Sequence, residues 1–355
     1  MEYSGDHGND RATERGGTTP PPSAVVGTRQ RIVTRRGVNI AAASCQANRR
    51  DETVGANPAQ VRLFPGFAHS SIDVGDGIKI HCAHGGSGPP LLLIHGYPQT
   101  HAIWHRIAQP LAQRHTVVCP DLRGYGDSSK PAGLPDHSNY SKRAMALDLV
   151  RVMQALGFQQ FAVVGHDRGG RVAHRMARDH RDAVTRLCVL DISPTLTMYE
   201  GTTMAFAAAY YHWFFLIQPT PYPETLIQHD PKFYLRKKTG GYGKKGHAHF
   251  TDDAYGEYER CFSDPATIHS TCEDYRASAT IDLDHDRADL SDKITCPLLA
   301  LWGADGVVHR LFKPIDDWSA VATDVRGKAL ACGHYVPEEV PEALLAELLP
   351  FLEGR

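Results

Sequence analysis

The sequence lacks three features that would assign it to a special class of protein. No apolar run approaches the roughly 20 residues that a membrane-spanning helix needs. The net charge of −2 over 355 residues indicates neither a nucleic acid nor a membrane surface as partner. The eight cysteines are scattered without a C-x-x-C pair, which is typical of reduced thiols in a cytoplasmic protein rather than of a disulfide framework.

Metal-ligand spacing is also absent, although the chain contains 20 histidines. There is no H-E-x-x-H motif, and the histidine-containing stretch at residues 246–253 is typical of a polar loop. We therefore expect neither a metal site nor a cofactor.

Residues 1–64 show no sustained apolar periodicity and contain the segments TTPPPS, RQRIVTRR and NRRDE. This composition is typical of disorder, and we interpret the segment as a disordered N-terminal tail. Two alternatives stay open, namely a targeting segment around TRRGVNIAAASC and a start codon assigned too early. The apolar part of that segment is shorter than the roughly 7–15 residues of a signal h-region.

From residue 65 onward, short apolar segments alternate with amphipathic ones. The alternation predicts an α/β protein with a mainly parallel sheet and helices on both faces, and a hairpin is expected around residues 75–77. The alternation stops between residues 195 and 290, where aromatic residues are frequent. We predict core parts at residues 65–194 and 291–355, with a helical cap at 195–290 over the carboxyl ends of the strands.

The stretch VVGHDRGGRVAHRMA, at residues 163–177, combines an apolar strand, a tight turn and a helix. Its GHDRG segment follows the G-x-S-x-G pattern of a nucleophile elbow, but Asp167 occupies the serine position. A carboxylate that attacked an ester would give an anhydride. Attack on saturated carbon instead displaces a leaving group and gives an alkyl ester, which water can hydrolyse at the aspartyl carbonyl. Asp167 therefore indicates a nucleophile for carbon–halogen or epoxide substrates.

Further residues would complete such a site. His334 follows the last predicted strand, which is where the catalytic base falls in enzymes with this elbow. Asp191 and Asp305 both end predicted strands, and either could accept a hydrogen bond from the imidazole. The backbone N–H groups of Tyr97 and Arg168 are the candidate oxyanion hole.

Positive charge and hydrogen-bond donors near the elbow narrow the substrate. Arg168 and Arg171 share one helix face, and their guanidinium forks match a carboxylate in bidentate geometry. A substrate carboxylate held there would place its neighbouring carbon near the nucleophile. For a leaving halide the cap offers donors on His212, Trp213 and Tyr275, although aromatic packing explains these three residues equally well.

Motifs from residue 67 to the C-terminus resemble the haloacetate (fluoroacetate) dehalogenases of the α/β-hydrolase fold. They are HGYPQT, DLRGYGDSSKP, GHDRGGRVAHRMA, LDISPT, YYHWFFLIQPTPYPE, IHSTCEDYRA and CGHYVPEE. The resemblance implies Asp167 as nucleophile, His334 as base and Asp191 as the acid that orients it. It also implies the carboxylate and halide roles given above and a homodimer, whereas Asp305 occupies the position that epoxide hydrolases use for the acid.

We therefore expect a cytoplasmic, cofactor-independent hydrolase that converts a small anionic haloacid and water to glycolate and halide, without a nucleic-acid or membrane partner. An epoxide hydrolase with the same triad is one alternative, and it would need cap tyrosines directed at the epoxide oxygen. A ligand receptor that binds without turnover is the other.

Overall fold

Across residues 52, 53, 55–240 and 246–355, which the computed structural model describes, nine strands form one sheet in the order β1-β2-β3-β5-β4-β6-β7-β8-β9. The strands are β1 (Glu52–Thr53), β2 (Ala68–Gly75), β3 (Ile78–Gly86), β4 (Pro90–Ile94), β5 (Thr116–Pro120), β6 (Phe161–His166), β7 (Val184–Leu190), β8 (Leu298–Gly303) and β9 (Val325–Leu330). All pairs from β5 to β9 are parallel, and β1, β2 and β3 join antiparallel at one edge. The predicted α/β fold with a mainly parallel sheet is confirmed, and β2 and β3 form the expected hairpin.

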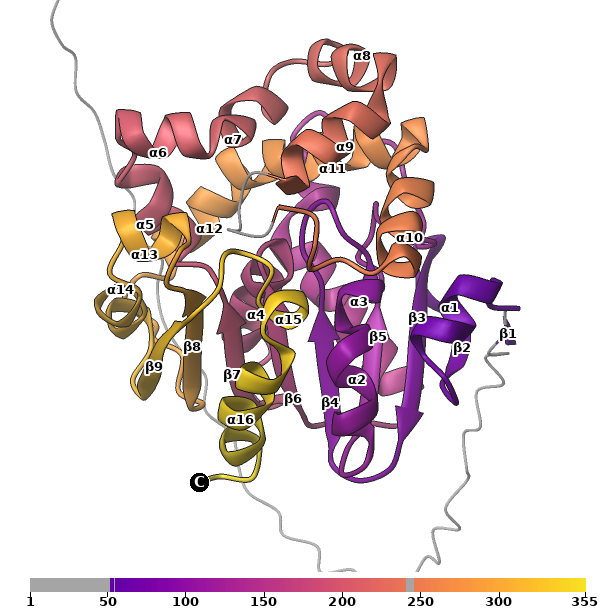
Figure 1. Cartoon of the computed structure of the whole chain (residues 1–355). Helices are drawn as coiled ribbons and strands as arrows, with labels where there is room; N and C mark the ends of the chain where they lie inside the picture. Colours follow the sequence, from indigo (N-terminus) through magenta and orange to yellow (C-terminus); the bar gives the residue numbers. More distant parts are fainter. Residues whose placement is uncertain (1–51, 54, 241–245) are drawn as a thin grey trace, which may run out of the picture. The chain divides into compact units, whose positions relative to one another are not determined.

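Helices of the core cover both faces of this sheet. They are α1 (Pro58–Leu63), α2 (His105–Ala112), α3 (Lys142–Ala155), α4 (Arg168–Asp179), α13 (Val307–Leu311), α14 (Pro314–Val321), α15 (Val336–Glu339) and α16 (Pro341–Leu352), with the 3-10 segments η1 (His101–Trp104) and η2 (Ser138–Tyr140). The chain passes from β4 to β5 and then crosses back to β6 on the other side of β4, so right-handed connections place α2 and α3 on opposite faces. α16 packs beside α2, and α4 packs beside α3 (Figure 1).

The stretch between β7 and β8 contains the cap. Its helices are α5 (Thr195–Glu200), α6 (Met204–Ala209), α7 (Tyr211–Leu216), α8 (Tyr222–His229), α9 (Pro231–Gly240), α10 (Asp252–Phe262), α11 (Pro265–Ala279) and α12 (Ile281–Ala288). Figure 1 shows these helices, in red and orange, gathered over one end of the sheet. Loops that follow β4, β6 and β7 open toward the cap, and the order of the strands reverses at β4. In open α/β sheets this reversal is where ligands bind.

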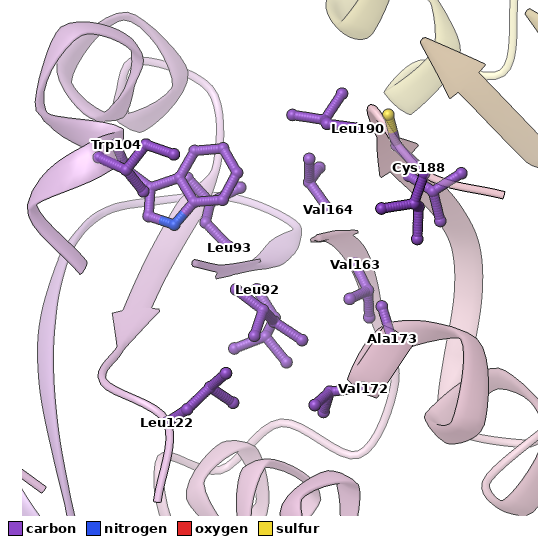
Figure 2. Close-up of a cluster of buried hydrophobic side chains, with 14 of the residues drawn as sticks. Leu92, Leu93, Trp104, Leu122, Val163, Val164, Val172, Ala173, Cys188 and Leu190 are labelled. Carbon is purple, nitrogen blue, oxygen red and sulfur yellow. The ribbon is translucent and has the colours of Figure 1, made fainter. Parts of the chain in front are cut away.

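The apolar core fixes the position of the turn that carries Asp167. Leu92 of β4 and Val163 of β6 are buried on a sheet that is covered on both faces, and Val172 and Ala173 of α4 pack against them (Figure 2). Each fully buried leucine or valine side chain contributes roughly 1.5–3 kcal/mol relative to an exposed one. Because strand and helix are both anchored in this way, the turn between them has little freedom to move.

The structure differs from the prediction of a disordered tail through residue 64, because residues 58–63 form α1. Asn57 accepts a hydrogen bond from the Gln60 N–H at 2.9 Å, and Gln60 accepts one from the Asn57 N–H at 3.0 Å, which together make a capping box. The buried Gln60 amide also donates to Asp127 at 2.9 Å and to Glu257 at 3.0 Å. These partners are distant in sequence, so local composition does not reveal them. Residues 1–51 lie outside the described residues.

Two further observations concern the described part of the chain. None of its helices combines the length and the apolar character needed to cross a membrane. Its seven cysteines form no disulfide, and all except Cys296 are buried, in keeping with the expected reduced thiols.

Candidate active site

Asp167 occupies a strained turn between β6 and α4. Its backbone adopts φ 47° and ψ −114°, a region that residues with a side chain rarely enter. Two glycines make room for the turn. A Cβ at Gly96 would lie 2.5 Å from the Cβ of Asp167, and a Cβ at Gly169 would lie 2.2 Å from the backbone oxygen of Ile94. The segment therefore has the strand–turn–helix geometry of a nucleophile elbow, with a carboxylate at its apex.

The imidazole of His334 lies between two carboxylates. Its Nδ1 is 2.6 Å from Oδ2 of Asp191, and its Nε2 is 4.0 Å from Oδ2 of Asp167. Asp191 also accepts a hydrogen bond from the Gly303 N–H at 3.0 Å, which fixes the orientation of its carboxylate. A proton shared between Nδ1 and Asp191 makes Nε2 the basic nitrogen, on the side of Asp167.

Of the two candidate acids, Asp191 has its carboxylate against the imidazole of His334. It follows β7 and has φ 52°, a second strained position at the end of a strand. Asp305 follows β8, and its backbone N–H donates to the backbone oxygen of Cys332 at 3.0 Å. The contact with Nδ1 of His334 favours Asp191 as the orienting acid, and its role stays a prediction.

Backbone donors approach Asp167 from the loop after β4. The Tyr97 N–H donates to Oδ1 of Asp167 at 3.0 Å, as expected of an oxyanion-hole donor. Arg168 begins α4, and the first N–H groups of a helix have no partner within the helix. The contribution of the Arg168 N–H to the oxyanion hole stays a prediction.

The charges around Asp167 favour its ionised form. Burial raises the pKa of this carboxyl, because removal from water favours the neutral form. The neighbouring histidines His334 and His166 and the guanidinium groups of Arg171 and Arg168 outweigh burial and hold the pKa below its ordinary value. Asp167 is therefore a carboxylate at neutral pH, as a nucleophile must be.

Arg168 is fully buried and is held by the cap. Its Nε donates to Asp274 at 3.0 Å, and its Nη2 donates to the same carboxylate at 2.7 Å and to Ser278 at 2.5 Å. Nη1 is also buried, and it has no hydrogen-bond partner among the described residues. We expected the whole guanidinium fork of Arg168 to be open to the substrate. Only its Nη1 amino group is without a partner among the described residues. The physical reason is that a buried guanidinium requires a counter-charge, which Asp274 supplies.

Arg171 lies one turn further along α4. Its Nη1 donates to Oγ1 of Thr195 at 3.0 Å and to the backbone oxygen of Ser193 at 3.3 Å, and its Nε is buried without a partner in the described part of the chain. The guanidinium carbon lies 4.6 Å from the ring of Trp213. No acidic side chain of the described residues forms an ion pair with Arg171. Its buried positive charge therefore favours an anion.

The three predicted halide donors come together beside these arginines. The ring of Tyr275 lies 4.1 Å from the guanidinium carbon of Arg168, and His212 stacks on Tyr97 with 6.1 Å between ring centroids. Burial lowers the pKa of His212 well below its ordinary value, so its ring is neutral and carries one N–H donor. The hydroxyl of Tyr275 and the indole N–H of Trp213 are buried without hydrogen-bond partners among the described residues. Aromatic packing and donors suited to an anion thus coexist here.

Sequence reasoning missed Lys238, a buried residue of α9. Its ammonium lies 5.9 Å from the ring centroid of Tyr97. Burial lowers the pKa of Lys238 well below its ordinary value, and Asp167 is the group that raises it. A lysine in KKTG on a cap helix is usually solvent-exposed, so only the tertiary position of α9 reveals it.

The sheet, the strained elbow and the histidine–carboxylate pair define the class of the protein, an α/β hydrolase. The family model described as alpha/beta hydrolase fold matches residues 89–318. A fluoroacetate dehalogenase of Burkholderia sp is 47% identical over 290 residues, which are 82% of this chain and 95% of that protein. A soluble epoxide hydrolase of Corynebacterium sp. (strain C12) is 36% identical over 280 residues, which are 78% of this chain and 94% of that protein.

Among solved structures, ALR0039 of Nostoc sp PCC 7120, described as an α/β hydrolase, superposes with a TM-score of 0.80. The two chains are 54% identical, and their alignment covers 81% of this chain and 99% of the Nostoc chain. The chain belongs to the haloacetate (fluoroacetate) dehalogenase family of the α/β-hydrolase fold.

Proposed function

We propose that this protein hydrolyses haloacetate to glycolate and halide through an ester of Asp167. The observation that carries the proposal is an ionised carboxylate at the elbow beside a buried arginine, Arg171, whose Nε has no hydrogen-bond partner in the described part of the chain. A substrate with its own carboxylate would neutralise that charge. The fluoroacetate dehalogenase of Burkholderia sp supports the same substrate class.

In the first step, an oxygen of Asp167 attacks the carbon that carries the halogen. A carbon–oxygen bond forms, the carbon–halogen bond breaks, and the halide leaves with the electron pair. The unpartnered Nη1 of Arg168 and Nε of Arg171 bind the substrate carboxylate, and the donors of Trp213 and Tyr275 face the departing halide. The neutral ring of His212 adds a third donor.

In the second step, Nε2 of His334 takes a proton from water, and the hydroxide attacks the carboxyl carbon of Asp167. The Tyr97 N–H stabilises the oxyanion that forms. The bond between the carboxyl carbon and the glycolate oxygen then breaks, and glycolate takes the proton from His334. Asp167 is left as an acid, and its low pKa returns it to the carboxylate with release of one proton.

A single turnover in heavy-oxygen water, with enzyme in excess, tests this route. The product should be mostly unlabelled glycolate, and the peptide that contains Asp167 should carry the label, because the product oxygen comes from the carboxylate. His334→Asn should release one halide per chain and then retain a glycolyl ester on the same peptide. Labelled glycolate at first turnover, with no halide burst in the variant, would show that water attacks directly.

Epoxide hydrolysis is the second candidate. The buried hydroxyl of Tyr275, which has no partner among the described residues, could donate to an epoxide oxygen, and the Corynebacterium relative is an epoxide hydrolase. Product formation from styrene oxide and halide release from fluoroacetate, measured side by side, separate the two activities. Absence of both would favour a receptor without turnover. The homodimer stays a prediction, which light scattering can check.

A further inference from the structure

We propose that His69, His81 and His101 form a binding site for a divalent transition-metal cation of the zinc type, outside the catalytic group. The three side chains come from β2, β3 and η1 and are 4%, 4% and 0% exposed, respectively. One ring nitrogen from each lies within 4.8 Å of one from each of the others. The rings face one another, with centroids 5.5 Å apart for His69 and His81 and 5.2 Å apart for His81 and His101.

The separation of the ring nitrogens fits a tetrahedral metal. Nδ1 of His69 and Nε2 of His81 are 3.4 Å apart. Two imidazole nitrogens bound to zinc at roughly 2.0–2.1 Å in tetrahedral geometry are about 3.3–3.4 Å from each other. Nε2 of His101 is buried and has no hydrogen-bond partner among the described residues. Three imidazoles so close together could each contribute one ring nitrogen to the same cation.

Asp121 holds His101 in the orientation that a metal ligand needs. Its Oδ1 lies 2.9 Å from Nδ1 of His101 and accepts the backbone N–H of the same residue at 2.8 Å. Because Nδ1 is paired with Asp121, we assign Nε2 of His101 to the metal, and carboxylates orient metal-bound histidines in the same way. Oδ2 of Asp121 accepts the Asp127 N–H at 3.0 Å, so both oxygens are already engaged.

The same contacts decide which kind of cation fits. Asp127 is close enough to His81 and Asp121 to complete a second possible ligand group. Its Oδ2, however, already accepts from Gln60 at 2.9 Å and from Arg260 at 2.7 Å. With these oxygens occupied, magnesium and calcium lack the oxygen ligands they require, whereas imidazole nitrogens suit zinc, cobalt, nickel and copper.

The site would connect two parts of the fold that are far apart in sequence. β2 and β3 form the antiparallel hairpin near the edge of the sheet, and η1 follows the loop that carries Tyr97. A cation shared between them would stabilise the folded chain, because the unfolded chain does not hold the three ligands together. The expectation from sequence spacing that no metal site exists is therefore replaced by this proposal.

The test uses the full chain without a histidine tag, treated with a chelator and then titrated with Co(II) or Zn(II). We expect about one cation per chain, with the visible absorption bands of tetrahedral Co(II), and a rise in melting temperature with Zn(II). Loss of a residue that hydrogen-bonds to a metal ligand weakens metal binding about 10–100-fold. Loss of a ligand itself, in His69→Gln or His81→Gln, should weaken binding at least as much. His115→Gln is the matched control and should bind the cation normally. His115 is also buried, but it precedes β5, whereas Asp121, which contacts His101, follows β5.

X-ray absorption of the zinc-loaded wild-type protein gives a readout that does not depend on the folding of any variant. Three imidazole ligands at about 2.0 Å would support the site. The proposal is overturned if the wild type binds much less than one cation per chain, or if fewer than three imidazoles surround the zinc. Equal binding by the wild type, both ligand variants and the control would assign the cation to other histidines and would also overturn it.

Discussion

Replacement of Asp274 by asparagine tests whether the cap holds Arg168 in position for the substrate. The Asp274 carboxylate is fully buried and accepts hydrogen bonds from Nε and Nη2 of Arg168 at 3.0 and 2.7 Å. It also accepts from the Tyr125 hydroxyl at 2.6 Å and forms an ion pair with Lys142. Asparagine keeps the shape of the side chain but removes its charge, so two buried cations lose their shared partner.

The expected loss of stability follows from burial. Breaking a buried ion pair by removing one partner costs about 3–5 kcal/mol, because an uncompensated charge stays out of water. The matched control is Asp253→Asn, which breaks a bidentate contact with Arg62 of the same chemistry. That pair is largely solvent-exposed, with 58% and 37% of the two side chains accessible. Water replaces the lost partner there, so we expect urea unfolding of the control to match the wild type.

The expected loss of activity follows from the contacts of Arg168. Without Asp274 to bind Nε and Nη2, its Nη1 is no longer directed to the substrate carboxylate. A hydrogen bond to a charged group is worth about 1.5–3 kcal/mol, which corresponds to a fall of about 10- to 150-fold in kcat/KM at about 1.4 kcal/mol per factor of ten. Halide release from haloacetate, measured with an ion-selective electrode, gives this ratio, and circular dichroism confirms that the variant is folded at the assay temperature.

Acid unfolding provides an independent check on the same residue. Burial raises the pKa of Asp274, but the charges of Arg168 and Lys142 outweigh burial and hold this pKa well below its ordinary value. A carboxyl with a depressed pKa contributes stability above its unfolded value of about 3.9 and loses it as the pH falls toward the folded value. The stability difference between wild type and Asp274→Asn should therefore shrink below about pH 4. Full kcat/KM together with unchanged stability in the variant would refute the reasoning.

The remaining predictions concern the triad and the second arginine. Asp191→Asn should reduce turnover by as much as about 10⁴-fold, by analogy with the loss of the orienting acid in serine proteases, and Asp305→Asn much less; the reverse order in steady-state halide release would assign the role to Asp305. Arg171→Lys keeps the charge but loses the guanidinium Nε, so kcat/KM should fall at least tenfold with unchanged circular dichroism, whereas wild-type kinetics would exclude the contact. The halide burst of His334→Asn should be constant from pH 5 to 9, because the guanidinium groups of Arg171 and Arg168 stay in this variant and still lower the pKa of Asp167; stopped-flow halide detection checks this, and a burst that titrates in that range would contradict it.

Several features of the site could be predicted, because they follow either from local sequence or from the order of strands and loops along the chain. The elbow at Asp167 needs only a strand, a tight turn with glycines and a helix, all within fifteen residues. His334 follows from chain order, because parallel strands carry their loops to one edge of the sheet. The same reasoning brought Tyr97 to the elbow, and its N–H is 3.0 Å from Asp167.

Other features depend on contacts between residues far apart in sequence. Asp191 and Asp305 both follow strands, so the sequence did not distinguish them. The packing of β7, β8 and the loop of His334 brings Oδ2 of Asp191 to 2.6 Å from Nδ1 of His334. The guanidinium groups of Arg168 and Arg171 donate largely to residues that lie far from them in sequence, among them Asp274 from the cap. Sequence spacing does not reveal these contacts.

The α/β-hydrolase fold could be predicted from the sequence, because apolar periodicity and the residues of the elbow act through neighbours along the chain. Tertiary structure alone decided which charges are paired and which are not. Helix α1 lies in a stretch with the composition of a tail, Lys238 is buried on a polar helix, and His69 and His101 meet although 32 positions separate them. Burial makes charge and hydrogen bonding strong, and burial is a property of the whole packed chain rather than of any segment.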